Sequence, residues 1–153
     1  MGAFFEGFLQ NRVLIIAVVG WFTAQSFKVV TVLASKKKFD FKYFVSAGGM
    51  PSSHAAFVMS MAVAVGLEAG WDSTLFGLAL AFALIVMYDA SGVRQAAGKQ
   101  AEVLNIIVED MFKSHKIAEK RLKELLGHTP FEVFAGGLLG IVVALIMNQV
   151  LAL

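Results

Sequence analysis

The chain has 153 residues, of which 58% are hydrophobic and only 16% are charged, and its mean hydropathy is +0.75. Soluble domains usually contain about 25% charged residues, so the composition excludes an ordinary soluble protein and indicates an integral membrane protein. The formal net charge of +2 argues against a nucleic-acid-binding protein, and the absence of cysteine excludes disulfides and thiolate chemistry.

Four apolar segments each approach the roughly 20 residues that a helix needs to cross a hydrocarbon core of about 30 Å. They predict an all-α membrane bundle of about four transmembrane helices, with one domain over residues 1–153. The expected spans cover residues 13–33, 53–70, 74–91 and 131–153.

The first span contains Lys28 late in an otherwise apolar run. An ionisable side chain at that depth is costly and usually pairs or lines a functional site, although a lysine near a helix end can also extend to the headgroups. Both interpretations remain open for this lysine. Arg12 precedes the span as in a secretory signal, but no convincing small-residue cleavage site follows, so we expect the span to be retained.

The second span begins in the run Pro51-Ser52-Ser53-His54, which follows two glycines. Ser52 is suited to cap the helix, and the unpaired N–H groups of a helix N-terminus bind anions. The hydroxyl groups of Ser52 and Ser53 add donors for phosphate oxygens, and the imidazole of His54 can donate a proton to a leaving group. The alternative is a capped membrane helix without a ligand.

The third span is closed by Asp89 and Arg94, which can form a structural ion pair. Arg94 is also a good phosphate ligand because its guanidinium presents a bidentate fork, with Asp89 as a supporting residue behind it. The connection over residues 95–126 repeats apolar residues at three- and four-residue steps in its first half. It predicts one or two amphipathic helices along the cytoplasmic interface. They can serve as a plain connection, or as a lid or a segment that contacts lipid headgroups.

The last span follows the run His128-Thr129-Pro130-Phe131-Glu132. Thr129 and Glu132 have the spacing of a capping box, with Pro130 at the first helical position. Glu132 also lies four residues from His128, where a carboxylate can hold one imidazole N–H and leave the other nitrogen as a nucleophile. Both functions require Glu132 at the same place.

Lysine and arginine gather in the connections after the first and third spans, whereas the turn between the second and third spans has none. By the positive-inside rule both basic connections are cytoplasmic and both termini lie outside. The four polar clusters then reach the same face. Two histidines, a lysine, an arginine and a carboxylate at one surface suit phosphoryl transfer, which rests mainly on positioning and charge neutralisation.

These residues resemble the motifs of the type 2 phosphatidic acid phosphatase superfamily, and the chain is similar to its divergent bacterial and plastid branch. Lys28 resembles the lysine of the first motif, and the Pro-Ser-Ser-His run that ends at His54 resembles the Pro-Ser-Gly-His motif. Residues 92–94 and 128–133 resemble the two halves of the third motif. The resemblance covers about residues 25–140.

The chain departs from the superfamily pattern at several positions. No Arg-Pro follows Lys28, and Glu132 replaces the usual aspartate. A 33-residue insertion separates Arg94 from His128 where the usual motif is compact. Typical membrane members have six spans, whereas four are expected here. These differences affect the expected activity more than the expected fold.

The resemblance implies a role for each matching residue. His128 would be the nucleophile that forms a phosphohistidine, Glu132 would orient it, and His54 would be the general acid. The phosphoryl oxygens would be held by Lys28, Ser52, Ser53 and Arg94. Similar enzymes need no metal, and we expect no other cofactor.

The expected function is therefore a membrane-embedded lipid-phosphate phosphatase with its site on the cytoplasmic side. Its substrate would be a phosphomonoester or diphosphate of a lipid, such as a phosphatidylglycerol phosphate, a phosphatidate or an isoprenoid phosphate. The competing hypothesis is a non-catalytic membrane protein that binds anionic lipid headgroups or forms part of a transporter. The Gly-xxx-Gly spacing of Gly136 and Gly140 suits either a homodimer or packing inside one subunit.

Overall fold

The computed structural model describes residues 6–7, 9–36, 49–112 and 127–152. Within these ranges the regular structure is entirely helical, as the composition and periodicity predicted. The helices named in the described part of the chain are α2 (Arg12–Lys36), α4 (Ser53–Ala69), α5 (Thr74–Ser91), α6 (Val93–Phe112) and α7 (Pro130–Ala152).

Three stretches of these helices are long and apolar enough to cross a membrane by length and composition. They are Arg12–Thr31, Thr74–Glu109 and Pro130–Leu151. Helix α4 is also apolar, but its 17 residues make it shorter than the other three stretches. The expectation of about four spans therefore corresponds to three long candidate spans and one shorter apolar helix.

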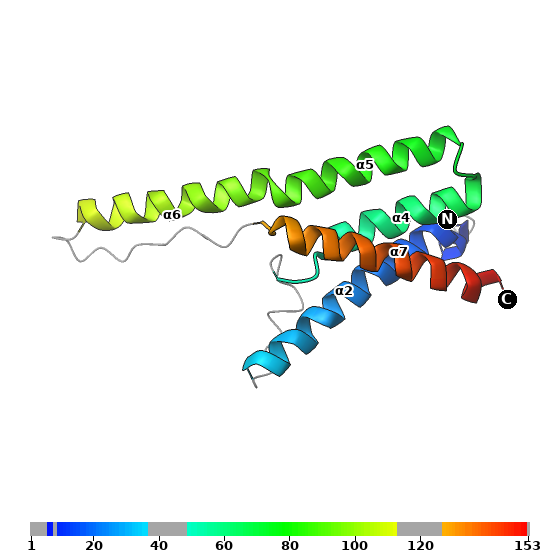
Figure 1. Cartoon of the computed structure of the whole chain (residues 1–153), viewed down its shortest axis with the longest axis horizontal. Helices are drawn as coiled ribbons and strands as arrows, with labels where there is room; N and C mark the ends of the chain where they lie inside the picture. Colours follow the sequence, from blue (N-terminus) through cyan, green and yellow to red (C-terminus); the bar gives the residue numbers. More distant parts are fainter. Residues whose placement is uncertain (1–5, 8, 37–48, 113–126, 153) are drawn as a thin grey trace.

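Helix α4 lies at the centre of the bundle, where it packs against α2, α5 and α7 (Figure 1). Glycines allow the close approach. A Cβ atom on Gly20 of α2 would collide with the side chain of Ser60, and one on Gly136 or Gly140 of α7 would collide with the backbone of α4. The Gly-xxx-Gly face of α7 is therefore used for packing inside this chain.

Local sequence signals explain where the central helices begin and end. The Ser52 side chain accepts a hydrogen bond from the backbone N–H of Ala55 at 3.4 Å, which confirms the expected cap of α4. Gly70, with a φ of +96°, ends that helix, because a positive φ strains residues that have a Cβ. Ser73 then caps α5 by accepting a hydrogen bond from the N–H of Phe76.

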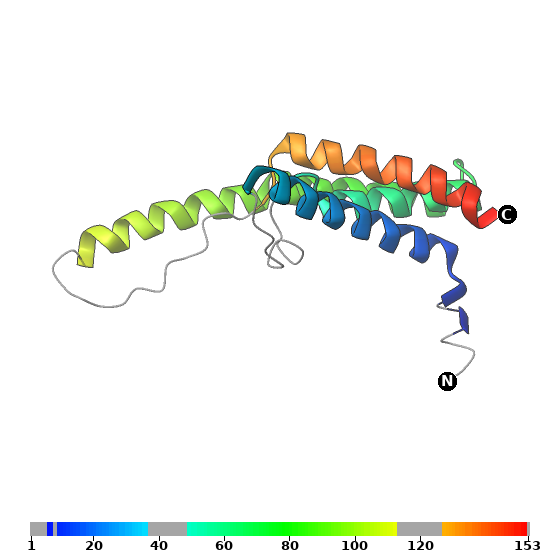
Figure 2. The same cartoon turned by 90° about the horizontal axis from the view of Figure 1, so that it is seen from below.

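Helices α5 and α6 meet at Gly92 and form a nearly straight rod that extends beyond the rest of the bundle in both views (Figures 1 and 2). Backbone hydrogen bonds at Gly92 continue across the junction, to Tyr88 on one side and from Ala96 on the other. Helix α6 covers the first part of the expected amphipathic segment 95–126. Residues 113–126 lie outside the described residues.

Candidate functional site

The end of α5 and the starts of α4 and α7 meet at one end of the bundle, and Lys28 of α2 contacts the start of α4 there. Backbone hydrogen bonds fix these ends to one another. The N–H of Ser52 donates to the carbonyl of Glu132 at 3.0 Å, and the N–H of His128 donates to the carbonyl of Ala90 at 2.9 Å. The starts of α4 and α7 and the end of α5 are thereby held in register.

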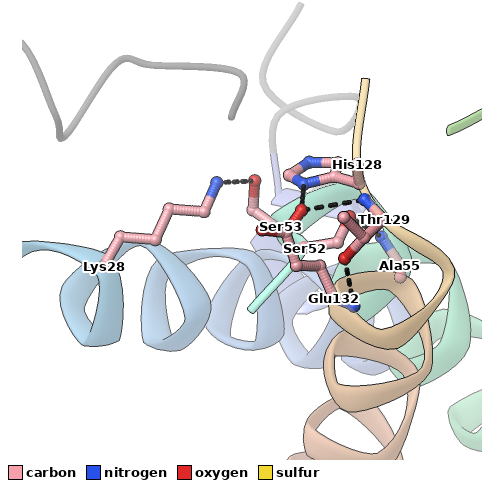
Figure 3. Close-up of polar contacts among 7 residues, drawn as sticks. All are labelled: Lys28, Ser52, Ser53, Ala55, His128, Thr129 and Glu132. Carbon is pink, nitrogen blue, oxygen red and sulfur yellow. Dashed lines mark hydrogen bonds and ion pairs between the residues drawn. The ribbon is translucent and has the colours of Figure 1, made fainter. Parts of the chain in front are cut away.

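Lys28 projects from α2 into this end of the bundle (Figure 3). Its Nζ donates a hydrogen bond to Oγ of Ser53 at 3.2 Å, and the two residues are only 2% and 1% exposed. Of the two interpretations open from the sequence, the structure favours a paired lysine over one that extends to the headgroups. A buried ammonium group close to a helix N-terminus is well placed to attract an anion.

Glu132 makes both of the contacts that its spacing suggested. Its Oε2 accepts a hydrogen bond from the backbone N–H of Thr129 at 3.0 Å, and the N–H of Glu132 donates to Oγ1 of Thr129 at 3.3 Å, which completes the capping box. The same Oε2 lies 3.1 Å from Nδ1 of His128 (Figure 3). A carboxylate at Nδ1 favours the tautomer with the proton on that nitrogen.

The other ring nitrogen of His128, Nε2, is buried and has no hydrogen-bond partner in the described part of the chain. Burial lowers the pKa of His128 below its ordinary value, and the hydrogen bond that the ring donates to Glu132 partly opposes that shift. The imidazole is therefore neutral at neutral pH. A neutral imidazole with a free Nε2 and a proton held on Nδ1 is chemically a nucleophile.

His54 lies in the first turn of α4, directly after the capped end. Its Nδ1 is buried and, among the residues described, without a hydrogen-bond partner. The ring is close enough to His128, Lys28 and Arg94 to interact electrostatically with all three. The two histidines therefore belong to one electrostatic site.

Arg94 and Asp89 occupy the margin of the site. Nε of Arg94 donates to Oδ2 of Asp89 at 2.8 Å, so the structural ion pair considered from the sequence is present, and both side chains are well exposed. Ser52 is fully buried and acts as the α4 cap. The structure thus groups Lys28, Ser53 and His128 tightly, and it leaves Arg94 at the edge.

One residue that positions the site was missed in the sequence. Gly127 has a φ of +90°, and a Cβ atom on it would collide with the backbone of Arg94 and Gln95. This turn brings His128 under the end of α5. A glycine immediately before the His-Thr-Pro run was the available signal, because a tight turn before a helix start often needs one.

The charges at the site suit an anion more than a cation. Lys28, Arg94 and the donors of the first α4 turn supply positive potential, while the carboxylates of Glu132 and Asp89 are engaged by His128 and Arg94. Among the described residues, no three His, Asp or Glu side chains form a group that could hold a metal ion.

These observations define a helical membrane protein with a buried polar site between its helix ends. The sequence profile of the Divergent PAP2 family matches residues 9–143. The chain belongs to that family, which confirms the resemblance noted from its motifs. It is 42% identical over 150 residues to the uncharacterized membrane protein YuiD of Bacillus subtilis (strain 168), and the alignment covers 91% of this chain and 95% of that protein. No solved structure matches the chain significantly.

Proposed function

We propose that the protein is a membrane-embedded phosphatase that hydrolyses the phosphate ester of a lipid through a phosphohistidine intermediate. The observation that supports this function most strongly is the state of His128. Its Nδ1 is held by Glu132 at 3.1 Å, while its Nε2 is buried without a hydrogen-bond partner among the described residues, in a site that also contains Lys28 and His54. Such an arrangement prepares one nitrogen for attack and holds the ring in place.

In the first step, Nε2 of His128 attacks phosphorus and the bond from phosphorus to the ester oxygen breaks. His54 gives a proton to the departing alkoxide, so that the lipid alcohol leaves neutral. In the second step, a water attacks the phosphohistidine and loses a proton to His54. The bond between phosphorus and Nε2 breaks, and inorganic phosphate leaves. Glu132 stabilises the positive charge that the ring acquires in the first step.

The phosphoryl oxygens are bound by groups that the fold brings to the start of α4. The side chain of Ser52 accepts the hydrogen bond of the Ala55 N–H. The N–H groups of Ser53 and His54, in the first turn of the helix, have no intrahelical acceptors. Together with the ammonium of Lys28, these N–H groups neutralise charge on the phosphoryl group. Arg94 contributes after its guanidinium turns from Asp89 to the substrate.

The proposed topology has four spans, with α4 as the short second one and the site at the cytoplasmic face. The continuous stretch of 36 residues through α5 and α6 would be roughly 54 Å long at about 1.5 Å per residue. This length exceeds the hydrocarbon core of about 30 Å, so α5 crosses the membrane and α6 emerges from it. The basic connections support a cytoplasmic location for that emerging end under the positive-inside rule.

The decisive experiment measures phosphate release by the purified protein from a panel of lipid phosphates in detergent. We expect activity that vanadate inhibits and chelators leave unchanged. His128→Ala should lower it by at least about 1,000-fold, because removing a nucleophile eliminates the covalent route. His115→Ala, which changes the third histidine of the chain, is the control. Full activity of His128→Ala would refute the mechanism.

A second candidate function is the binding of anionic lipid headgroups without catalysis. It is favoured by two departures from the phosphatase motifs, the missing Arg-Pro after Lys28 and the 33 residues that separate Arg94 from His128. The same lipid panel separates the two. Headgroup binding by wild type and His128→Ala alike, with no phosphate release from either, supports the binding protein.

A further inference from the structure

Three buried side-chain atoms lack a hydrogen-bond partner in the part of the chain that the structure describes. They are His54 Nδ1, His128 Nε2 and Gln25 Oε1. The first two belong to the proposed phosphoryl-transfer site. Gln25 is only 4% exposed, and a buried acceptor without a donor costs free energy, all the more in a membrane. The presence of an unpaired acceptor at this buried position suggests that a hydrogen-bond donor binds to Gln25.

Gln25 lies on the face of α2 that points into the bundle. It precedes Lys28 by three residues, so the two side chains share one side of the helix. The contact of Lys28 with Ser53 is on one side of Gln25 along α2, and the contact of Gly20 with Ser60 is on the other. The carboxamide is therefore placed between α2 and its neighbours, one turn deeper in the bundle than the ammonium group.

The hydroxyl groups around Gln25 already donate to backbone carbonyls. Thr23 donates to Val19, and Ser26 donates to Phe22. Across the interface, Ser60 lies within hydrogen-bonding distance of the carbonyls of Ala56 and Phe57, at 2.6 and 3.1 Å. None of these hydroxyls serves Gln25. The acceptor is thus left for a group from outside the described chain.

We propose that Gln25 is a specificity residue that accepts a hydrogen bond from a free hydroxyl on the alcohol portion of the lipid phosphate. This inference rests on the proposed phosphatase function. The rise from Lys28 to Gln25 is about 4.5 Å along α2, in the direction in which the acyl chains of a bound lipid would run. A hydroxyl on the carbon next to the ester carbon lies on that side of the phosphate.

The proposal separates the candidate substrates by chemistry. Phosphatidylglycerol phosphate has a hydroxyl at the required place, on the central carbon of its terminal glycerol. Phosphatidate and isoprenoid phosphates have none there. A site with a buried acceptor discriminates strongly against an analogue that leaves the acceptor unpaired. The favoured substrate class is therefore a lipid phosphomonoester of a glycerol that retains a free hydroxyl.

The test compares phosphatidylglycerol phosphate with an analogue that lacks the central hydroxyl of the terminal glycerol, using the full chain in detergent. Wild type should show a kcat/KM at least about tenfold higher for the hydroxylated substrate. Gln25→Leu should remove that preference by lowering only the value for the hydroxylated substrate. Gln149→Leu, on an exposed position of α7, is the control and should behave as wild type.

Thermal unfolding gives a second readout. A purely structural role of Gln25 would make Gln25→Leu lower the melting temperature, whereas the proposed role does not. Gln25→Leu removes an unpaired buried acceptor, so the melting temperature should stay the same or rise. A lower melting temperature would reveal a structural partner and overturn the inference. Equal loss on both substrates would also overturn it, because Gln25 would then act on the phosphate or through Lys28.

The outcomes for wild type distinguish this inference from the function on which it rests. Hydrolysis of both substrates at equal kcat/KM overturns the role of Gln25 and leaves the phosphatase intact. Hydrolysis of neither substrate, nor of any other lipid phosphate in the panel, overturns the phosphatase and the role of Gln25 together.

Discussion

At the site end of the bundle Lys28 and His128 are each only 2% exposed, whereas Arg12 and Glu68 at the opposite end are exposed and line a cavity of about 230 Å³ with Asn148. Charged side chains that face water are hydrated and need no protein partner. Arg12 and Glu68 at the opposite end are therefore satisfied by solvent. Burying a charge is costly unless it is paired. Among the described residues, the buried ionisable side chains Lys28 and His128 lie at one end of the bundle, which supports the proposed site there.

Replacing a cation at each end gives the largest expected contrast. Lys28→Met should lower phosphate release by about 100- to 1,000-fold, the usual range for removing a group that stabilises transition-state charge. Its melting temperature should be unchanged or higher, because an apolar side chain replaces a buried charge. Arg12→Met should leave activity within about twofold, since solvated groups away from the site contribute little. If Lys28→Met and Arg12→Met changed activity equally, the proposed site could not be assigned to the end of the bundle that contains Lys28.

Adding a methyl group at each end sharpens the same contrast through packing. At Gly136 a Cβ would collide with the backbone of Ser52, which cannot move away, whereas at Gly66 it would meet the exposed side chain of Trp71. Gly136→Ala should therefore destabilise the protein by about 1–3 kcal/mol, and Gly66→Ala by less.

Thermal unfolding in detergent measures both packing variants. Gly77→Ala is the control, because nothing lies within 4 Å of a Cβ there. It should be neutral or slightly stabilising, since alanine is the better helix former. If Gly136→Ala unfolds at the same temperature as this control, α4 and α7 do not pack as closely as described.

The pH dependence of the rate tests the contact between Glu132 and His128. Nucleophilic attack needs neutral His128, so the rate should fall as the pH drops through its pKa, which burial lowers below the ordinary value. Glu132 opposes that lowering. Glu132→Gln should therefore move the acidic fall of kcat to lower pH and reduce the maximal rate by about 100-fold, the lower end of the range typical of general acid–base groups. A shift to higher pH, or no shift, would contradict the assigned contact.

The ion pair at the margin of the site should have the smallest effect. Asp89→Asn removes the partner of Arg94, but both side chains are well exposed, and exposed ion pairs contribute only about 0–1 kcal/mol. We expect a change in unfolding free energy within that range and activity close to that of wild type. A loss of activity above about tenfold would instead make Asp89 necessary for positioning Arg94.

Local signals in the sequence predicted the parts of the structure that depend on neighbours along the chain. The cap at Ser52, the capping box of Thr129 and Glu132, and the helix start at Pro130 were all predicted, because each depends on hydrogen bonds within one turn. The motifs also indicated the family correctly.

Features that depend on contacts between distant segments could not be read in the same way. From spacing alone, Lys28 could either pair inside the bundle or extend to the headgroups. The contact with Ser53, which lies on another helix, favours pairing. Spacing also left Gly136 open between packing inside one subunit and a homodimer. That glycine packs inside the chain, and the homodimer stays a prediction. The unpaired Oε1 of Gln25 became visible only once its surroundings were known.

The bond that joins the start of α4 to the start of α7 is formed by main-chain atoms alone, from the N–H of Ser52 to the carbonyl of Glu132. The spacing of these two helix starts is therefore insensitive to the choice of side chains on the outer surface. Exposed apolar residues of α5, such as Leu75, Leu78 and Ile85, can be exchanged for polar ones without touching that bond. The bundle is in this respect a scaffold for redesign into a form that dissolves in water and keeps its buried polar site.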